Sequence, residues 1–237
     1  MSTSARSACA RRAFFGCLGS WLGRVLLLCL AAILLALPAP GQAWNADQMA
    51  QAARRLGPGA VAALPSLQAM LSSTPKQDEL TRLITVNRFY NLNVLFRTDM
   101  EIWNQEDYWA SPLETLNMGR GDCEDFAIAK YATLLAAGVP MERMRLVYVR
   151  ARLPDQASLV PHMVLAYYAR PDAEPLILDN LNPEVVPAGQ RPDLMPVFSF
   201  NSAGLWQGVG AHRAGDPMAR LSRWRDVWQR TLLEGFQ

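Results

Sequence analysis

The chain has 237 residues, a formal net charge of +2, and hydrophobic residues at 51% of its positions. Residues 1–43 hold four arginines and no acidic residue, so the other 194 residues carry a formal charge of −2. This remainder gives no reason to expect nucleic acid binding, and its length is enough for one ordinary domain with a full core. It contains no repeat, no low-complexity tract and no second domain boundary. We therefore expect a single domain over residues 44–237.

The first 43 residues have the pattern of a secretory signal peptide. An uninterrupted apolar run, Val25–Leu37, follows the arginines, and Gly41–Ala43 offers a small-residue cleavage site before Trp44. The run is short for a membrane span, which needs about 20 apolar residues, although an uncleaved anchor is the alternative. Cys29 follows a bulky leucine, which argues against a lipoprotein cleavage site. We therefore expect an exported protein that starts near Trp44.

Export leaves Cys123 as the only cysteine, because the other three lie within residues 1–43. A single thiol forms no internal disulfide and is exposed to oxidation outside the cytoplasm, so its retention indicates a use. The alternative is a small residue buried in the core. The cysteine alone leaves both interpretations open.

Three helices are expected at the start of the exported domain. The first, Ala46–Leu56, follows the capping residue Asn45 and ends at a Gly-Pro pair. The second, Ala60–Met70, consists of small residues and is expected to break at Pro65. The third is predicted to start at Thr74–Gln77, because this segment combines a capping box with proline at the first helical position.

The third helix carries an apolar stripe that is predicted to face the core. The stripe consists of Leu80, Leu83, Ile84, Phe89 and Tyr90. Three asparagines lie near the end of this helix: Asn87, Asn91 and Asn93. Amides at such positions either line a site or bond to caps and loops, and the sequence does not decide between the two.

Residues 96–116 are aromatic and acidic without clear periodicity, and we interpret them as a structured loop. A tryptophan in this loop either walls an active-site cleft, donates its indole N–H to an oxyanion, or packs beneath the loop, which is the commonest arrangement. The loop leads to a helix that Asp122 caps and that runs to about Ala137, where Gly138 and Pro140 stop it. Cys123 then lies in the first turn, where backbone N–H groups and the helix dipole favour a thiolate.

Beyond this helix the apolar pattern changes from helical to alternating. It predicts strands over Arg145–Arg150, His162–Ala169 and Leu176–Asp179, with a fourth over Met195–Asn201. A last helix, from Pro217 onward, carries two tryptophans on one apolar face, for which core packing is favoured over lipid contact. That face consists of Leu221, Trp224, Val227, Trp228 and Thr231 or Leu232.

A hairpin between the second and third strands would bring a base and an acid together. If these strands pair about a turn centred near Arg170 and Pro171, His162 lies opposite Asp179 at one end of the sheet. There the imidazole can donate one ring N–H to the carboxylate while its other nitrogen meets the thiol of Cys123. Covalent acyl-transfer enzymes use this arrangement. The pairing depends on the register, which a slip of two residues would change.

Asp122, Glu124 and Asp125 surround the cysteine with negative charge, which opposes formation of a thiolate. One carboxylate serves as the helix cap, but three exceed what capping needs. A bound divalent cation would neutralise them, and hard carboxylate oxygens suit calcium. A solvated acidic turn explains the same residues equally well.

The segment Gly121–Tyr131, which reads Gly-Asp-Cys-Glu-Asp-Phe-Ala-Ile-Ala-Lys-Tyr, resembles the LapG family. These are transglutaminase-like cysteine proteinases of the bacterial periplasm. Four further segments also resemble that family: Asp107–Trp109, His162–Leu165, Leu178–Asn180 and Pro196–Asn201. The resemblance covers roughly residues 74–206. It implies a papain-related fold of the α+β class, with N-terminal helices and a nucleophile helix packed on an antiparallel sheet.

The resemblance also implies a catalytic triad of Cys123, His162 and Asp179, and calcium held in part by Asp122 and Glu124. The expected function is a periplasmic, calcium-dependent cysteine endopeptidase. It would cut a large surface adhesin near its N-terminus at a paired-alanine site and so release biofilm. An inner-membrane cyclic di-GMP receptor of LapD type would hold it inactive. Two alternatives stay open: a transglutaminase-like acyltransferase, and a calcium-stabilised binding module with an inert thiol.

Overall fold

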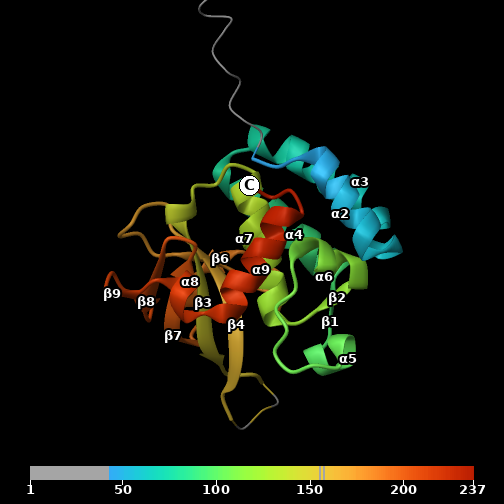
Figure 1. Ribbon diagram of the computed structural model, residues 1–237. Coiled ribbons are helices and arrows are strands. Elements are labelled where there is room, and N and C mark those ends of the chain that lie inside the picture. Colours follow the sequence, from blue (N-terminus) through green and yellow to red (C-terminus); the bar gives the residue numbers. More distant parts are fainter. Residues whose placement is uncertain (1–42, 155, 157) are drawn as a thin grey trace, which may run out of the picture. The chain divides into compact units, whose positions relative to one another are not determined.

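The structure, a computed structural model, describes residues 43–154, 156 and 158–237 (Figure 1). Apart from Ala43, the predicted signal peptide lies outside these residues. Within the described part of the chain, no helix has the length and apolar character needed to cross a membrane. The described helices and strands form a mixed α+β fold, as the sequence predicts.

Two helices begin the described chain. Helix α2 (Ala46–Leu56) starts where the Asn45 side chain accepts the N–H of Gln48, which confirms the predicted cap. Helix α3 (Pro58–Ser73) continues through Pro65, so the predicted break is wrong. Helix α3 contacts α2 and α6 (Pro112–Met118) and buries residues on both sides of the proline, from Ala60 to Leu71. This packing outweighs the single helical hydrogen bond that proline cannot make.

Helix α4 (Glu79–Asn93) starts four residues later than the sequence predicts, since the predicted first helical residue is Pro75. Residues Thr74–Lys76 form only a short 3₁₀ turn, η1, and Asp78 caps the helix by accepting the N–H and the hydroxyl of Thr81. The buried face also differs from the predicted stripe. Leu83, Val86, Asn87 and Tyr90 are buried, whereas Leu80 and Ile84 are 50% and 46% exposed. The buried face of α4 is therefore centred nearer to Val86 than the predicted stripe is.

The segment interpreted as a loop contains two short helices, α5 (Asp99–Trp103) and α6 (Pro112–Met118). Both start at a capping box, formed by Thr98 with Glu101 and by Ser111 with Glu114. Helices this short have no apolar periodicity to detect, so only their caps mark them in the sequence. Two-residue strands flank them, β1 (Leu95–Phe96) and β2 (Arg120–Gly121), and pair in parallel.

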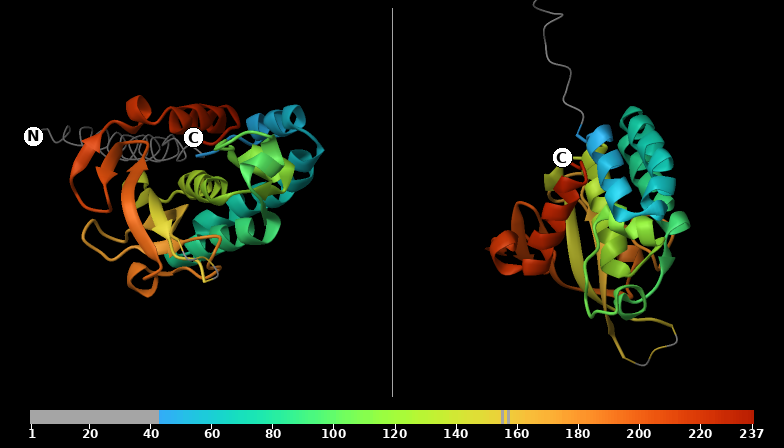
Figure 2. Two further views of the ribbon diagram at one scale, coloured as in Figure 1. Left: turned by 90° about the horizontal axis from the view of Figure 1, so that it is seen from below. Right: turned by 45° about the vertical axis from the view of Figure 1, so that its right-hand side comes forward.

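Helix α7 (Cys123–Ala136) is the centre of the core and confirms the predicted cysteine helix. Asp122 and Asp125 form its capping box, and nearly all of its side chains beyond the first turn are buried. It contacts α4 and α6 on one side and strands β3 and β4 on the other. Figure 2 shows α7, in yellow-green, between the N-terminal helices and the sheet.

The sheet has seven antiparallel strands in the order β6-β5-β4-β3-β7-β8-β9. The four predicted strands are confirmed as β3 (Met144–Ala151), β4 (Val160–Tyr167), β5 (Leu176–Leu178) and β7 (Leu194–Asn201). Three strands of two to four residues were not predicted: β6 (Val186–Pro187), β8 (Gly204–Gln207) and β9 (Arg213–Gly215). The 3₁₀ turns η2 (Met141–Arg143) and η3 (Ala188–Gln190) precede β3 and β7.

Two helices complete the described chain, α8 (Pro217–Arg220) and α9 (Ser222–Leu233). Trp224 is fully buried, where its ring lies against Phe200 of β7 and stacks on Trp228. This confirms that the tryptophan face packs on the core. Thr231 is buried and Leu232 is 42% exposed, so Thr231 belongs to that face.

Candidate active site

Local backbone geometry sets Cys123 at the first position of α7. Gly119 ends α6 in the left-handed region, with φ of 59°, and the chain turns directly into β2. At Gly121 a Cβ atom would lie 2.9 Å from the Cβ of Asp125, so only glycine lets the chain pass this close to the helix. The thiol is partly buried and donates a hydrogen bond to Glu124 Oε2 at 2.9 Å.

The surroundings of Cys123 disfavour a thiolate when no cation is present. Burial and the adjacent Glu124 carboxylate raise the pKa of the Cys123 thiol well above its usual value, and Asp122 adds to this. A hydrogen bond with the backbone of Met163 lowers the pKa of the thiol, but by less than these groups raise it. Burial and the carboxylates together therefore outweigh the helix N-terminus, which by itself lowers a cysteine pKa.

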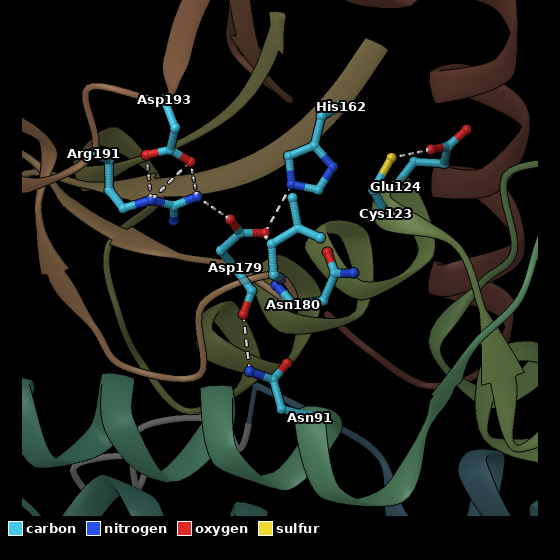
Figure 3. A network of polar contacts seen from close by, with 9 residues as sticks. Asn91, Cys123, Glu124, His162, Asp179, Asn180, Arg191 and Asp193 are labelled. Carbon is cyan, nitrogen blue, oxygen red and sulfur yellow. Dashed lines mark hydrogen bonds and ion pairs between the residues drawn. The ribbon is translucent and has the colours of Figure 1, made fainter. Parts of the chain in front are cut away.

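The structure brings together the predicted base and acid. His162 in β4 and Asp179, just after β5, are 5% and 2% exposed, and His162 Nε2 lies 2.8 Å from Asp179 Oδ1. Figure 3 shows the imidazole between Asp179 and Cys123, with its other ring nitrogen on the side of the cysteine. Within the described residues, the thiol hydrogen bond goes to Glu124 and not to His162.

The predicted strand register is wrong by two residues. In the observed ladder Leu165 pairs with Leu178, which places Asp179 beside Val164 instead of His162. The hairpin turn is therefore centred one residue later than the sequence arithmetic assumes. An offset of two residues keeps a side chain on the same face of a sheet, so Asp179 still reaches His162 diagonally.

The Asp179 carboxylate is held on both oxygens. Oδ1 also accepts the backbone N–H of Asn180 at 2.7 Å and of Leu181 at 3.2 Å. Oδ2 lies 2.8 Å from Arg191 Nη2. Burial alone would raise the pKa of Asp179, but the hydrogen bond and charge of His162, together with Arg191, lower it to about 2. Asp179 is thus a fixed carboxylate at neutral pH.

Two of the three asparagines in α4 hold the loop that carries Asp179. The Nδ2 group of Asn91 donates to the backbone carbonyl of Asp179 at 2.8 Å, and that of Asn87 donates to Pro183 at 2.9 Å. Asn93 bonds back to Phe89 within its own helix. Asn87 and Asn91 therefore support the loop behind the site, whereas Asn93 does not.

A cluster of carboxylates lies beside Cys123. Carboxylate oxygens of Asp99, Asp122 and Asp125 lie within 4.8 Å of one another, and Asp122 and Glu124 form a second such group with the thiol. Oδ1 of Asp99 and Oδ1 of Asp122 are buried without a hydrogen-bond partner among the described residues. Burial, followed by neighbouring carboxylates, raises the pKa of Asp99 to about 6 and that of Asp122 to about 10.

These unpartnered oxygens fit a hard cation, since several buried carboxylates tolerate one another only when protonated or neutralised. Asp122 belongs to both groups, and Glu124 to the group that includes the thiol. Asp99 was not identified from the sequence, because it lies 23 positions before Asp122 in a segment interpreted as a loop. The pairing of β1 with β2 brings it to the start of α7.

Cys123 and His162 open onto a cleft of about 680 Å³. Aromatic side chains form much of its wall: Phe96, Trp109, Tyr148 and Phe198. Trp109 combines two of the roles considered for a tryptophan here, since it lines the cleft and also stacks on Phe200 with ring centroids 6.0 Å apart. Its indole N–H donates to Asp107 at 2.9 Å. The cleft is large enough for several residues of an extended peptide.

Comparison with known proteins places this geometry in a family. Residues 65–210 match the family described as bacterial transglutaminase-like cysteine proteinase BTLCP. LapG from Legionella pneumophila in its EGTA-treated form is 36% identical, with 79% of this chain and 97% of that chain covered and a TM-score of 0.68. Its calcium-bound form is 35% identical, with 78% and 98% covered and a TM-score of 0.66. No curated protein matches. The chain therefore belongs to the bacterial transglutaminase-like cysteine proteinase family.

Proposed function

We propose that this cysteine proteinase hydrolyses peptide bonds with Cys123 as the nucleophile, His162 as the base and Asp179 as the orienting acid. The observation that carries the proposal is the 2.8 Å contact of His162 Nε2 with Asp179 Oδ1, both buried, at a cleft that contains the only thiol of the described chain. The Asp179 contact fixes the ring orientation, so that the other nitrogen is available to the thiol.

The reaction would proceed in two steps. The free nitrogen of His162 takes the thiol proton, and the sulfur of Cys123 attacks the peptide carbonyl. Backbone N–H groups at the start of α7, which have no carbonyl partner within the helix, would stabilise the oxyanion. The imidazolium then protonates the leaving amine, and a thioester forms. Water, deprotonated by His162, hydrolyses this thioester and restores the thiol.

From the LapG resemblance, the proposed substrate is a large cell-surface adhesin, cut near its N-terminus at paired alanines in the periplasm. An inner-membrane cyclic di-GMP receptor of LapD type is the proposed inhibitor. The test uses the N-terminal fragment of such an adhesin from the same genome, with and without its Ala-Ala pair. The proposal is supported if the fragment with the Ala-Ala pair is cut into two products and the fragment without the pair is not cut. An amide adduct formed with added glycine amide in place of hydrolysis would instead identify an acyltransferase.

We further propose that the chain binds calcium through Asp122 and Glu124, with Asp99 as an additional ligand. The support is the pair of unpartnered buried oxygens on Asp99 and Asp122, and the calcium-bound form of the similar LapG structure. Calcium there would offset the negative charge that raises the pKa of the Cys123 thiol.

Calcium should therefore bind to metal-stripped protein and raise its melting temperature. At free calcium about 100 times the dissociation constant, linkage predicts an increase of about 5–10 °C for a domain of this size. Magnesium should do less, because it keeps its waters and demands a tighter shell. Calorimetric titration measures the binding, with Asp122→Ala plus Glu124→Ala and Asp99→Asn as test variants. Asp107→Asn, an exposed acid outside the cluster, is the control. Equal binding by the double variant would refute the site.

The calcium-free protein should also lose stability as pH rises. The folded protein holds protons on Asp99 up to about pH 6 and on Asp122 up to about pH 10, whereas the unfolded chain releases them near the ordinary value of 3.8. Stability falls with pH wherever the folded state binds more protons. The melting temperature of metal-stripped protein should thus decline relative to that in calcium from about pH 4 to pH 10, and most steeply below about pH 6, where both groups contribute. Parallel curves under the two conditions would contradict the cation site.

A further inference from the structure

Arg191 contacts the Asp179 oxygen that His162 does not use. It follows the turn η3, and its side chain is 5% exposed. Its Nη2 lies 2.8 Å from Asp179 Oδ2 and 2.8 Å from Asp193 Oδ2, and its Nε donates to Asp193 Oδ1 at 3.0 Å (Figure 3). The Asp193 contact is a two-point hydrogen-bonded pair. The Asp179 contact is an ion pair that lacks the alignment of a hydrogen bond.

The environment makes Arg191 the fixed cation of this carboxylate. The Asp179 side chain is fully buried, and a buried carboxylate needs a compensating charge and hydrogen bonds. Another buried basic residue, Lys130 of α7, has no hydrogen-bond partner in the part of the chain that the structure describes, and burial lowers its pKa to about 7. Arg191 stays charged: burial lowers its pKa, but Asp193 and Asp179 more than offset this and leave the pKa above the ordinary value. Asp193 in turn fixes the plane of the guanidinium.

We propose that Arg191 is a positioning residue for the reaction, which rests on the proposed roles of Cys123, His162 and Asp179. By holding Oδ2, it fixes the Asp179 carboxylate so that Oδ1 stays directed at His162 Nε2. Asp193 acts one step further out, by holding Arg191. The competing explanation is an ion pair that only anchors the loop before β7 to the end of β5. The two explanations differ in what loss of Arg191 does to the imidazole.

The first test is steady-state kinetics on the adhesin fragment. Arg191→Gln should lower kcat about 10–100-fold with KM nearly unchanged, the range found when groups that orient a site residue are removed. Asp193→Asn should lower kcat less. Arg143→Gln is the control, because Nη1 of Arg143 donates to both carboxylate oxygens of Glu79, at 3.0 and 2.7 Å, and neither residue lines the cleft that holds Cys123 and His162. Unchanged kcat in Arg191→Gln would overturn the proposal.

A double-mutant cycle separates positioning from anchoring. If Arg191 acts through Asp179, adding Arg191→Gln to Asp179→Asn should change the remaining kcat by less than about 2-fold. The alkylation rate of Cys123 by iodoacetamide is a second readout where turnover is slow. A full additional loss in the Asp179→Asn background would show that Arg191 acts by another route. It would overturn the proposal while leaving the proteolytic function intact.

Nuclear magnetic resonance of the imidazole tests the same point without substrate. The chain has two histidines, His162 and the exposed His212, so ¹⁵N-labelled protein gives two imidazole systems. Loss of a signal in His162→Gln and its retention in His212→Gln assign the Nε2–H proton of His162. That signal should broaden or vanish in Arg191→Gln and persist in Cys123→Ala. If Arg191→Gln does not fold, Asp193→Asn carries the test. An unchanged His162 signal in a folded variant of either position would contradict the proposal.

Discussion

Replacement of Cys123 by alanine should abolish cleavage of the adhesin fragment, with a loss of about 10⁵–10⁶-fold in kcat, as for other covalent nucleophiles. No other thiol in the described chain can take its place. The fold should persist, because alanine is a good helix former and Cys123 lies at the first position of α7. Cleavage rates and thermal unfolding of the purified variant measure both effects.

The control for this experiment is Cys123→Ser, which keeps nearly the same size and shape. A serine hydroxyl has a far higher pKa than a thiol, so His162 is not matched to deprotonate it, and this variant should also be inactive. Turnover of the fragment by purified Cys123→Ala at a rate near that of the wild type would end the assignment of the nucleophile.

Asp179→Asn should fold and lose about 10⁴-fold in kcat with little change in KM, the loss that follows when the acid of such a triad becomes an amide. The amide can present a donor to His162 Nε2 and so stabilise the wrong tautomer. It also removes the charge that stabilises the imidazolium during the reaction. The matched control is Asp172→Asn, since the Asp172 side chain is 84% exposed in the turn between β4 and β5.

The same two variants test whether Asp179 acts in the reaction or only ends strand β5. Asp172→Asn should keep wild-type kinetics, because it alters the same hairpin without contact to the imidazole. Wild-type kinetics in Asp179→Asn would mean that Asp179 only terminates β5 and that its 2.8 Å contact with His162 has no part in the reaction.

The sequence was sufficient for the parts of the site whose determinants are local. The cap at Asp122, the helix that follows it and the strand with His162 all result from patterns within about ten residues. Asp179 was found although the assumed register was wrong by two, because a shift of two preserves the face of the sheet. A shift of one would have placed it on the opposite face.

The parts that could not be predicted depend on contacts between distant segments. Arg191 lies 12 positions after Asp179, and nothing local distinguishes it from the other arginines of the chain. Only the path of the chain through β6 and η3 returns it to the carboxylate. Asp99 likewise reaches the acidic cluster through the pairing of two-residue strands. Such short elements take their stability from tertiary packing, which leaves little pattern in the sequence.

The most direct test of the covalent mechanism is intact-mass spectrometry of enzyme mixed with excess adhesin fragment and quenched in acid within the first turnovers. The mechanism predicts a species heavier than the enzyme by the mass of the acyl fragment, less the thiol hydrogen that it replaces. The adduct should map to Cys123, and hydroxylamine, which cleaves thioesters, should release it from the enzyme. It should accumulate more in Asp179→Asn, in which we expect slower deacylation. It should be absent from Cys123→Ala. Cleavage of the fragment with no adduct on Cys123 under any quench time, and equal cleavage by Cys123→Ala, would contradict the mechanism.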